Sequence, residues 1–346
     1  MAILRFMFTV MSFCGFWRPY SWTSGYKYVL YTIYTVFSWL SVYTVIIMQA
    51  LDIVLLVDNQ SDFFENLRLT MEYNAALFKM NTLLKNRKNF VNLLDTLNTE
   101  PLAPVSTDEI AIRKKFDKFA ELNGIILATA VLGLLIAMFG TALIDDNPRK
   151  LAYRIWLPYN YSSSVVYTVT FVCEAVSMIM IAFINVGSDS LFSGLLIHIY
   201  CLFEIFEHRL KKGVNEPETY SLKECVRLHK HIYKFAKMVN EEFKTIMMMQ
   251  FLVSTLTLCS ELYRLTQREV NSQYIEIVTY ATCVVMQLLF FCWYGNEVRL
   301  KSLEVSDMIF KSNWISLDPN ARKILLIIMI RSTSPIEFSS AQIFSM

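Results

Sequence analysis

Five long apolar runs constrain the fold of this chain more than any other feature of its sequence. They are Tyr28–Val57, Leu122–Ile144, Ser163–Val186, Ile246–Tyr263 and Tyr274–Tyr294. A helix needs roughly 20 apolar residues to cross the hydrocarbon core of a bilayer, and these runs have about that length. A weaker run, Phe63–Leu84, contains Arg68, Glu72 and Lys79. It indicates a helix packed among other helices rather than one facing lipid. The sequence therefore predicts an all-α, polytopic membrane bundle with six spans.

The composition excludes several other classes of protein. Of 346 residues, 55% are hydrophobic and only 18% are charged, whereas soluble domains carry about 25% charged residues. The net charge of +2 and the lack of a basic cluster with interleaved aromatics argue against nucleic-acid binding. We find no paired catalytic carboxylates, no phosphate-binding glycine loop and no metal-ligand spacing, so we expect neither an enzyme nor a cofactor. The seven cysteines lie in or beside apolar runs and favour packing over a disulfide framework.

The distribution of lysine and arginine predicts the orientation in the membrane. Twenty-five of the 32 lie in the N-terminal segment and in the stretches 85–118, 209–244 and 299–331. Only five lie in the connections expected on the opposite side. Because cytoplasmic loops are rich in Lys and Arg, the N-terminus is predicted to be cytoplasmic. Two sequons, at Asn59 and Asn160, fall in loops on the predicted outer side and are candidate glycosylation sites.

The segment Leu191–Phe206 allows two interpretations. As a separate short span it would place the following cations outside, but it has only 16 residues. Polar residues recur through it at helical spacing: Gly194, His198, Cys201, Glu204, His208 and Lys211. Such a stripe predicts that the fourth span continues into the cytoplasm and packs there against partners. A helix half-buried at the membrane surface is the alternative.

A regular apolar seam follows in the next cytoplasmic stretch. It consists of Leu222, Cys225, His229, Ile232, Ala236, Val239, Phe243 and Ile246, at alternating steps of three and four. This a/d pattern predicts a helix that buries one stripe against a neighbour. The neighbour can belong to the same chain or to another subunit, and the sequence leaves both open. His229 on this seam fits a core histidine better than a metal ligand.

The outer halves of the spans carry a different set of side chains. Glu174 is expected deep in the fourth span, where a carboxylate needs a cavity or a partner. At a similar depth lie Tyr73, Asn74, Met138, Phe139, Tyr167, Thr168, Phe171 and Tyr280. Aromatic, methionine and hydroxyl side chains with few charges suit a pocket for a small apolar ligand. Taken individually, each of them fits plain helix packing better than a ligand role.

Several motifs resemble those of the insect odorant receptors. Before the first span stands Gly15–Tyr20, with the sequence Gly-Phe-Trp-Arg-Pro-Tyr, and Asn185–Phe192 resembles the end of that family's fourth span. The most specific stretch is Phe291–Glu297, followed by Trp314 and by Arg322–Met329. These matches cover essentially the whole chain in the family's order. The chain is therefore identified as a member of this family.

The resemblance implies a single odorant-receptor domain over 1–346, a seven-helix subunit with its N-terminus inside. It implies a tuning subunit of a ligand-gated cation channel, assembled with the olfactory co-receptor in the plasma membrane of the sensory-neuron dendrite. Volatile odorants would bind within 28–206 and the sixth helix, at the nine outer residues named above. The region 207–346 would form the cytoplasmic anchor between subunits, with His229, Ile232, Phe243 and Trp314 as anchor residues.

One departure from the family pattern concerns the C-terminus. Family members continue past Pro335 into a final apolar helix that lines the pore, whereas the last apolar run here, Ile324–Ile330, has seven residues. Seven residues of helix, about 10 Å, do not span a bilayer. We therefore expect six spans rather than seven. A nonconducting membrane interaction protein is a rival interpretation, and a gustatory receptor of the same superfold is another.

Overall fold

The structure is a computed structural model that describes residues 4–18, 22, 25–57, 59–144, 151, 153–215, 222–267, 272–340 and 344–345. Residues 19 and 20 of the N-terminal motif lie outside this range. The helices are α1 Arg5–Phe13, α2 Tyr26–Leu55, α3 Gln60–Lys85, α4 Arg87–Thr96, α5 Thr107–Ile144, α6 Ser164–Asn215, α7 Leu222–Gln267, α8 Ser272–Lys311, the 3-10 turn η1 Trp314–Ser316, and α9 Pro319–Ser332. Two-residue strands β1 (Ser339–Ser340) and β2 (Phe344–Ser345) pair antiparallel near the C-terminus.

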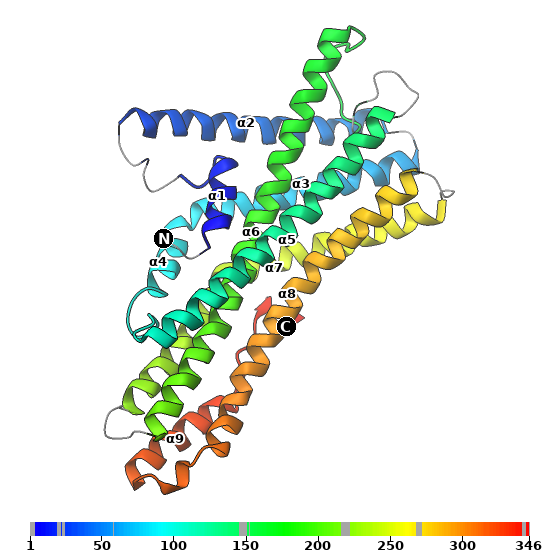
Figure 1. The fold of residues 1–346 in the computed structure, drawn as a ribbon. Coiled ribbons are helices and arrows are strands. Elements are labelled where there is room, and N and C mark those ends of the chain that lie inside the picture. The colour runs from blue at the N-terminus through cyan, green and yellow to red at the C-terminus, as the bar shows by residue number, and fades with distance from the viewer. Residues whose placement is uncertain are drawn as a thin grey trace.

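Long helices dominate the molecule. Helices α5 to α8 run alongside one another as extended rods, and α2 diverges from them (Figure 1). Five helices are long and apolar enough to cross a membrane, namely α2, α5, α6, α7 and α8. They contain the five strong apolar runs, so the prediction of an all-helical membrane bundle is confirmed.

Helix α3 corresponds to the weaker sixth run. Its 26 residues give about 39 Å of helix, enough for a span. Arg68 and Lys79 on this helix are each 1% exposed, and α3 packs against α2, α6 and α7. The prediction of a helix packed among others is therefore confirmed. Its charges face protein groups instead of lipid.

Helix α6 is the centre of the core. It is a single helix of 52 residues, and it packs against α1, α2, α3, α5, α7 and α8. From Val186 to Ile199 every residue is buried. Leu191–Phe206 is thus a continuation of the fourth span. One member of its polar stripe, His198, is satisfied inside the bundle: its Nε2 lies 2.9 Å from Asp117 Oδ1, and its Nδ1 lies 2.6 Å from the Gly194 carbonyl.

The apolar seam of α7 is buried within the chain. Its residues from Leu222 to Ile246 are all at most 6% exposed. The Phe243 ring lies 4.8 Å from that of Phe192 and 5.2 Å from that of Phe90. The His229 ring packs between Phe206 and Tyr233, at 5.2 and 4.9 Å. The neighbour of the seam, which the sequence left open, therefore belongs to the same chain.

The seam residues named as anchor residues lie inside the single chain. His229, Ile232 and Phe243 are at most 3% exposed. Their role in holding subunits together stays a prediction. Trp314, in η1, is half-buried and keeps part of its surface accessible.

Helix α1 is a short wedge that lies against the core. Leu4, Met7 and Met11 are at most 1% exposed, and α1 packs against α5 and α6. The chain then turns at Gly15, whose φ of 80° suits glycine. Phe16 and Trp17 are each 2% exposed. The N-terminal apolar segment is therefore part of the folded core.

Candidate ligand-binding site

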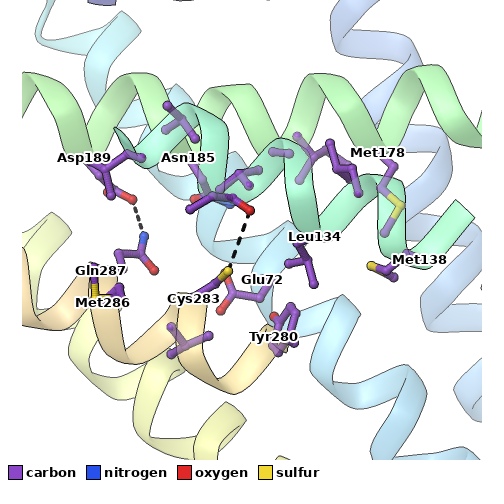
Figure 2. Close-up of a pocket in the computed structure, with 18 of the residues that line it drawn as sticks. Glu72, Leu134, Met138, Met178, Asn185, Asp189, Tyr280, Cys283, Met286 and Gln287 are labelled. Carbon is purple, nitrogen blue, oxygen red and sulfur yellow. Dashed lines mark hydrogen bonds between the residues drawn. The ribbon is translucent and has the colours of Figure 1, made fainter. Parts of the chain in front are cut away.

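A cavity of about 130 Å³ lies between α3, α5, α6 and α8. Most of its wall is aliphatic or thioether: Leu69, Ile126, Leu127, Ala130, Val131, Leu134, Leu135, Met138, Met178, Ile181, Ala182, Val186, Val284 and Met286. Apolar side chains line the cavity because each of the four helices turns an apolar face toward the others where they meet. Figure 2 shows Met138 and Met178 at one end and Asp189 with Gln287 at the other.

The polar end of the cavity is held by a buried ion pair. Lys79 Nζ lies 2.7 Å from Asp189 Oδ1 and donates to Asn185 Oδ1 at 3.0 Å. The amide of Gln287 donates to the other Asp189 oxygen. These contacts join α3, α6 and α8. A buried charge is tolerated when it is paired and hydrogen-bonded, and both conditions hold here.

Glu72 and Tyr280 lie on the cavity wall between the two ends (Figure 2). The Arg68 guanidinium lies over the ring of Tyr280, with its central carbon 4.5 Å from the ring centroid. Cys283 also faces the cavity, and its thiol lies 3.9 Å from the carbonyl of Ala130. The cavity therefore combines aromatic, sulfur and aliphatic surface with the carboxylates of Glu72 and Asp189.

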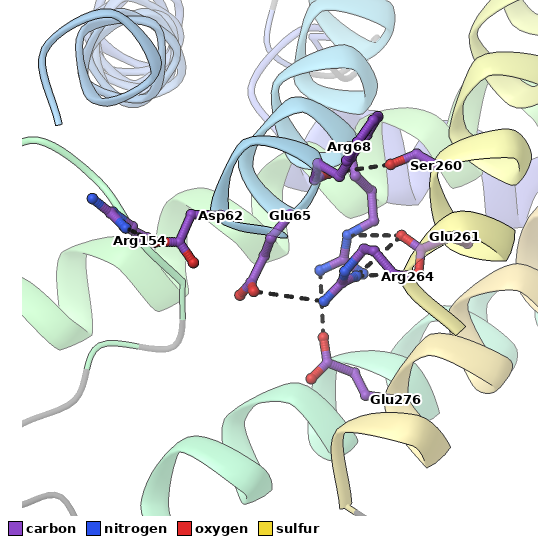
Figure 3. Close-up of polar contacts among 9 residues, drawn as sticks. Asp62, Glu65, Arg68, Arg154, Ser260, Glu261, Arg264 and Glu276 are labelled. Carbon is purple, nitrogen blue, oxygen red and sulfur yellow. Dashed lines mark hydrogen bonds and ion pairs between the residues drawn. The ribbon is translucent and has the colours of Figure 1, made fainter. Parts of the chain in front are cut away.

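Arg68 belongs to a network of buried charges beside the cavity (Figure 3). Its guanidinium lies 3.2 Å from Glu261 and 3.4 Å from Glu276, which belong to α7 and α8. Arg264 lies 3.1 Å from the same Glu261 and 3.6 Å from Glu65. Arg68, Glu261 and Arg264 are at most 4% exposed. The network ties α3, α7 and α8 together through charge-assisted contacts.

A family model described as 7tm Odorant receptor matches residues 59–346. The chain belongs to this odorant receptor family. A family of receptors fits the absence of catalytic motifs in the sequence. It also agrees with the resemblance that the sequence motifs indicate.

Individual odorant receptors show the same relationship at low identity. The chain is 29% identical over 198 residues to Odorant receptor 46a, isoform A, of Drosophila melanogaster, a match covering 54% of this chain and 48% of that protein. It is 23% identical over 285 residues to Odorant receptor 10 of Aedes albopictus, covering 79% of this chain and 76% of that protein. The first of these matches thus spans about half the length of the relative.

The fold of this odorant receptor is also found in a solved structure. It is similar to the insect olfactory receptor OR5 from Machilis hrabei in complex with eugenol, with a TM-score of 0.84 and 16% identity. The match covers 99% of this chain and 91% of that chain. At this identity the similarity concerns the fold alone.

Three of the nine predicted ligand residues of the receptor line the cavity: Tyr73, Met138 and Tyr280. The other six are placed elsewhere. Asn74 and Thr168 are exposed and hydrogen-bond to the carbonyls of Thr70 and Ser164. Glu174 is 2% exposed and accepts a hydrogen bond from the Tyr153 amide.

An aromatic group accounts for the remaining three residues. The ring of Phe171 lies 5.9 Å from that of Phe139 and 6.0 Å from that of Tyr167. These rings pack α5 against α6. They do not line this cavity, so a direct ligand role for them stays a prediction.

The polar cavity residues were not predicted as ligand residues. They are Glu72, Asn185, Asp189 and Gln287. Glu72 carried a usable signal, because an ionisable residue inside a membrane helix marks a functional site by default. Asn185 and Asp189 could be recognised only as part of a family motif. Gln287 is an isolated amide in an apolar run, and nothing local distinguishes it.

Proposed function

We propose that this odorant receptor binds small, largely apolar volatile ligands in the cavity between α3, α5, α6 and α8. In this proposal it is the tuning subunit of a ligand-gated cation channel formed with the olfactory co-receptor. Its place is the plasma membrane of the olfactory neuron dendrite. The apolar cavity carries the proposal, together with membership of the family.

The size and chemistry of the cavity support this ligand class. A cavity of about 150 Å³ lined by Leu, Ile and Phe stays dry and binds benzene, and the volume here is about 130 Å³. Binding would gain about 25 cal/mol for each Å² of apolar surface buried. A neutral molecule of one ring or a short chain therefore fits better than a polar metabolite. The named relative that binds eugenol is similar in fold.

The channel role supposes that ligand binding favours an open state. A ligand shifts such an equilibrium only by its difference in affinity for the two states. The cavity touches four helices that also continue toward the cytoplasmic end, so its occupancy can alter how they pack. Trp314 remains the proposed contact with the co-receptor, since it is the one predicted anchor residue with accessible surface.

The test is a recording of cation current from cells that express this chain with the co-receptor. A panel of volatiles including eugenol should evoke current that requires both chains. Leu134→Trp fills the cavity and should abolish the responses, whereas Leu132→Trp, on the 39% exposed face of the same helix, should leave them intact. Silence of the wild-type pair with surface expression demonstrated would reject the channel role. Equal responses from both Trp variants would reject the cavity as the binding site.

A further inference from the structure

We infer that the cavity selects apolar ligands that carry one hydroxyl group, and that the carboxylate of Glu72 makes this selection. The inference rests on the proposed function, since it assigns a ligand class to the same cavity.

Most polar groups at the cavity satisfy one another. Asp189 receives the ammonium of Lys79 and the amide of Gln287, and Asn185 receives a second hydrogen bond from Lys79. These residues form a closed set joining three helices. A ligand gains little from them, because a new hydrogen bond would have to replace an existing one.

Glu72 and Tyr280 differ from that set. Within the described part of the chain, the buried Glu72 Oε1 and Tyr280 hydroxyl make no hydrogen bond of standard geometry, and the only side-chain hydrogen-bond partner of the Glu72 carboxylate is Tyr280 itself. The nearest cations are occupied, Lys79 by Asp189 and Arg68 by Glu261 and Glu276. Both side chains line the cavity, and they lie close together in Figure 2. The wall thus offers an acceptor and a phenol at one place.

A ligand hydroxyl matches this pair of groups. A hydroxyl donates one hydrogen bond and accepts others, so it can donate to Glu72 Oε1 and accept from Tyr280. A hydrocarbon leaves Glu72 and Tyr280 with only each other. An ether or ester can only accept, which leaves the carboxylate unpaired. A protonated amine can donate to Glu72 but cannot accept from Tyr280. A site built to bond a hydroxyl discriminates strongly against analogues that lack it.

The experiment measures binding directly, so that it does not depend on channel current. The full chain is reconstituted in lipid nanodiscs, and dissociation constants are measured for benzyl alcohol, toluene, benzyl methyl ether and benzylamine. Empty nanodiscs correct for partition into lipid. Benzyl alcohol is expected to bind about tenfold more tightly than each of the other three, which corresponds to about 1.4 kcal/mol.

Variants connect this preference to the two residues. Glu72→Leu should remove the advantage of benzyl alcohol over toluene while toluene still binds, which also shows that the variant folds. Glu72→Gln keeps an acceptor oxygen and should retain part of the advantage. Tyr280→Phe should reduce the advantage of benzyl alcohol over toluene. This variant provides the test if Glu72→Leu does not fold. Glu100→Gln, on the exposed α4–α5 connection, is the matched control and should change nothing.

The outcomes separate this inference from the proposed function. Equal binding of all four probes, or an unchanged preference in Glu72→Leu and Tyr280→Phe, overturns the inference but leaves the cavity as a ligand site. Tighter binding of benzylamine overturns the hydroxyl in favour of a cation. Absence of binding by every probe overturns both. A hydroxyl preference without odour-evoked current supports the inference and counts against the channel role.

Discussion

Lys79 shows how a single residue can carry a charge into an apolar bundle. Its side chain lies on α3, yet its ammonium contacts Asp189 and Asn185 of α6 at 2.7 and 3.0 Å. Taking two charges out of water costs several kcal/mol, which a short, fully hydrogen-bonded pair offsets. Removing one partner leaves that cost without compensation. Removing one of the two charges is therefore expected to destabilise the protein more than removing both.

Replacing Lys79 by methionine should accordingly destabilise the protein. We expect a loss of about 3–5 kcal/mol, the usual effect of leaving a buried charge unpaired, and a lower thermal midpoint in detergent. The double variant Lys79→Met with Asp189→Leu should recover much of the loss, because neither charge is then present. Lys85→Met, at an exposed position of the same helix, serves as the control. A single variant as stable as the wild type would contradict this account.

Sequence reasoning reached part of this result. The charges of α3 identified a helix that must pack among others, and that was confirmed. Their partners could not be predicted, because Asp189 is 110 residues away in sequence and many carboxylates are available. The same limit explains why Phe139, Tyr167 and Phe171 were predicted as ligand residues although they do not line the cavity. Their depth could be read from the spans, but the direction in which each side chain points depends on helix rotation.

At the scale of elements, α1 depends on a close approach to α6. A Cβ atom added at Gly194 would lie 2.6 Å from Leu4 Cδ2 and 2.7 Å from Met7 Cε. One added at Gly187 would lie 3.1 Å from Met11 Cγ. Small residues on α6 thus make the groove that receives the wedge. The sequence showed an apolar N-terminal segment, whereas its position against α6 follows from contacts more than 170 residues apart.

Enlarging Gly194 should expel α1 from this groove. Gly194→Leu overpacks the contact, at a cost of about 1–3 kcal/mol, and should expose Cys14, which is 1% exposed. Alkylation of Cys14 by a maleimide, followed by mass spectrometry, measures the displacement. Gly133→Leu is the matched control, since nothing lies within 4 Å of a Cβ atom there. Equal protection of Cys14 in both variants would argue that α1 does not depend on the glycine.

At the scale of the whole molecule, the Lys- and Arg-rich stretches and the glycosylation sequons lie at opposite ends of the helices. The stretches rich in Lys and Arg include α4, the start of α5, the end of α6, the start of α7 and α9. The candidate glycosylation sites lie beyond the opposite ends of the spans, Asn59 at the start of α3 and Asn160 before α6. Both asparagines are exposed. The orientation stays a prediction, made from the charges and sequons of the loops and not from packing.

Glycosylation provides a measurement of that orientation. Protein made in microsomes should carry a glycan at Asn160, and Asn160→Gln should migrate faster on a gel. Asn98→Gln, in the connection predicted to be cytoplasmic, should leave the migration unchanged. Asn59 lies at the start of a helix, where its neighbours can hinder modification, so Asn160 is the decisive site. A wild-type chain without glycan would count against an outer position for this loop.

The length of α6 has a mechanical consequence. From Ile181 at the cavity to its end at Asn215, the helix extends about 51 Å at 1.5 Å per residue. Each degree of tilt about the cavity therefore displaces the far end by about 0.9 Å, if the helix moves as a rigid rod of this rise. A tilt of a few degrees at the cavity therefore displaces the far end of α6 by several ångströms. Under the proposed function, this length transmits a small ligand-induced change in packing from the cavity to the far end of the helix.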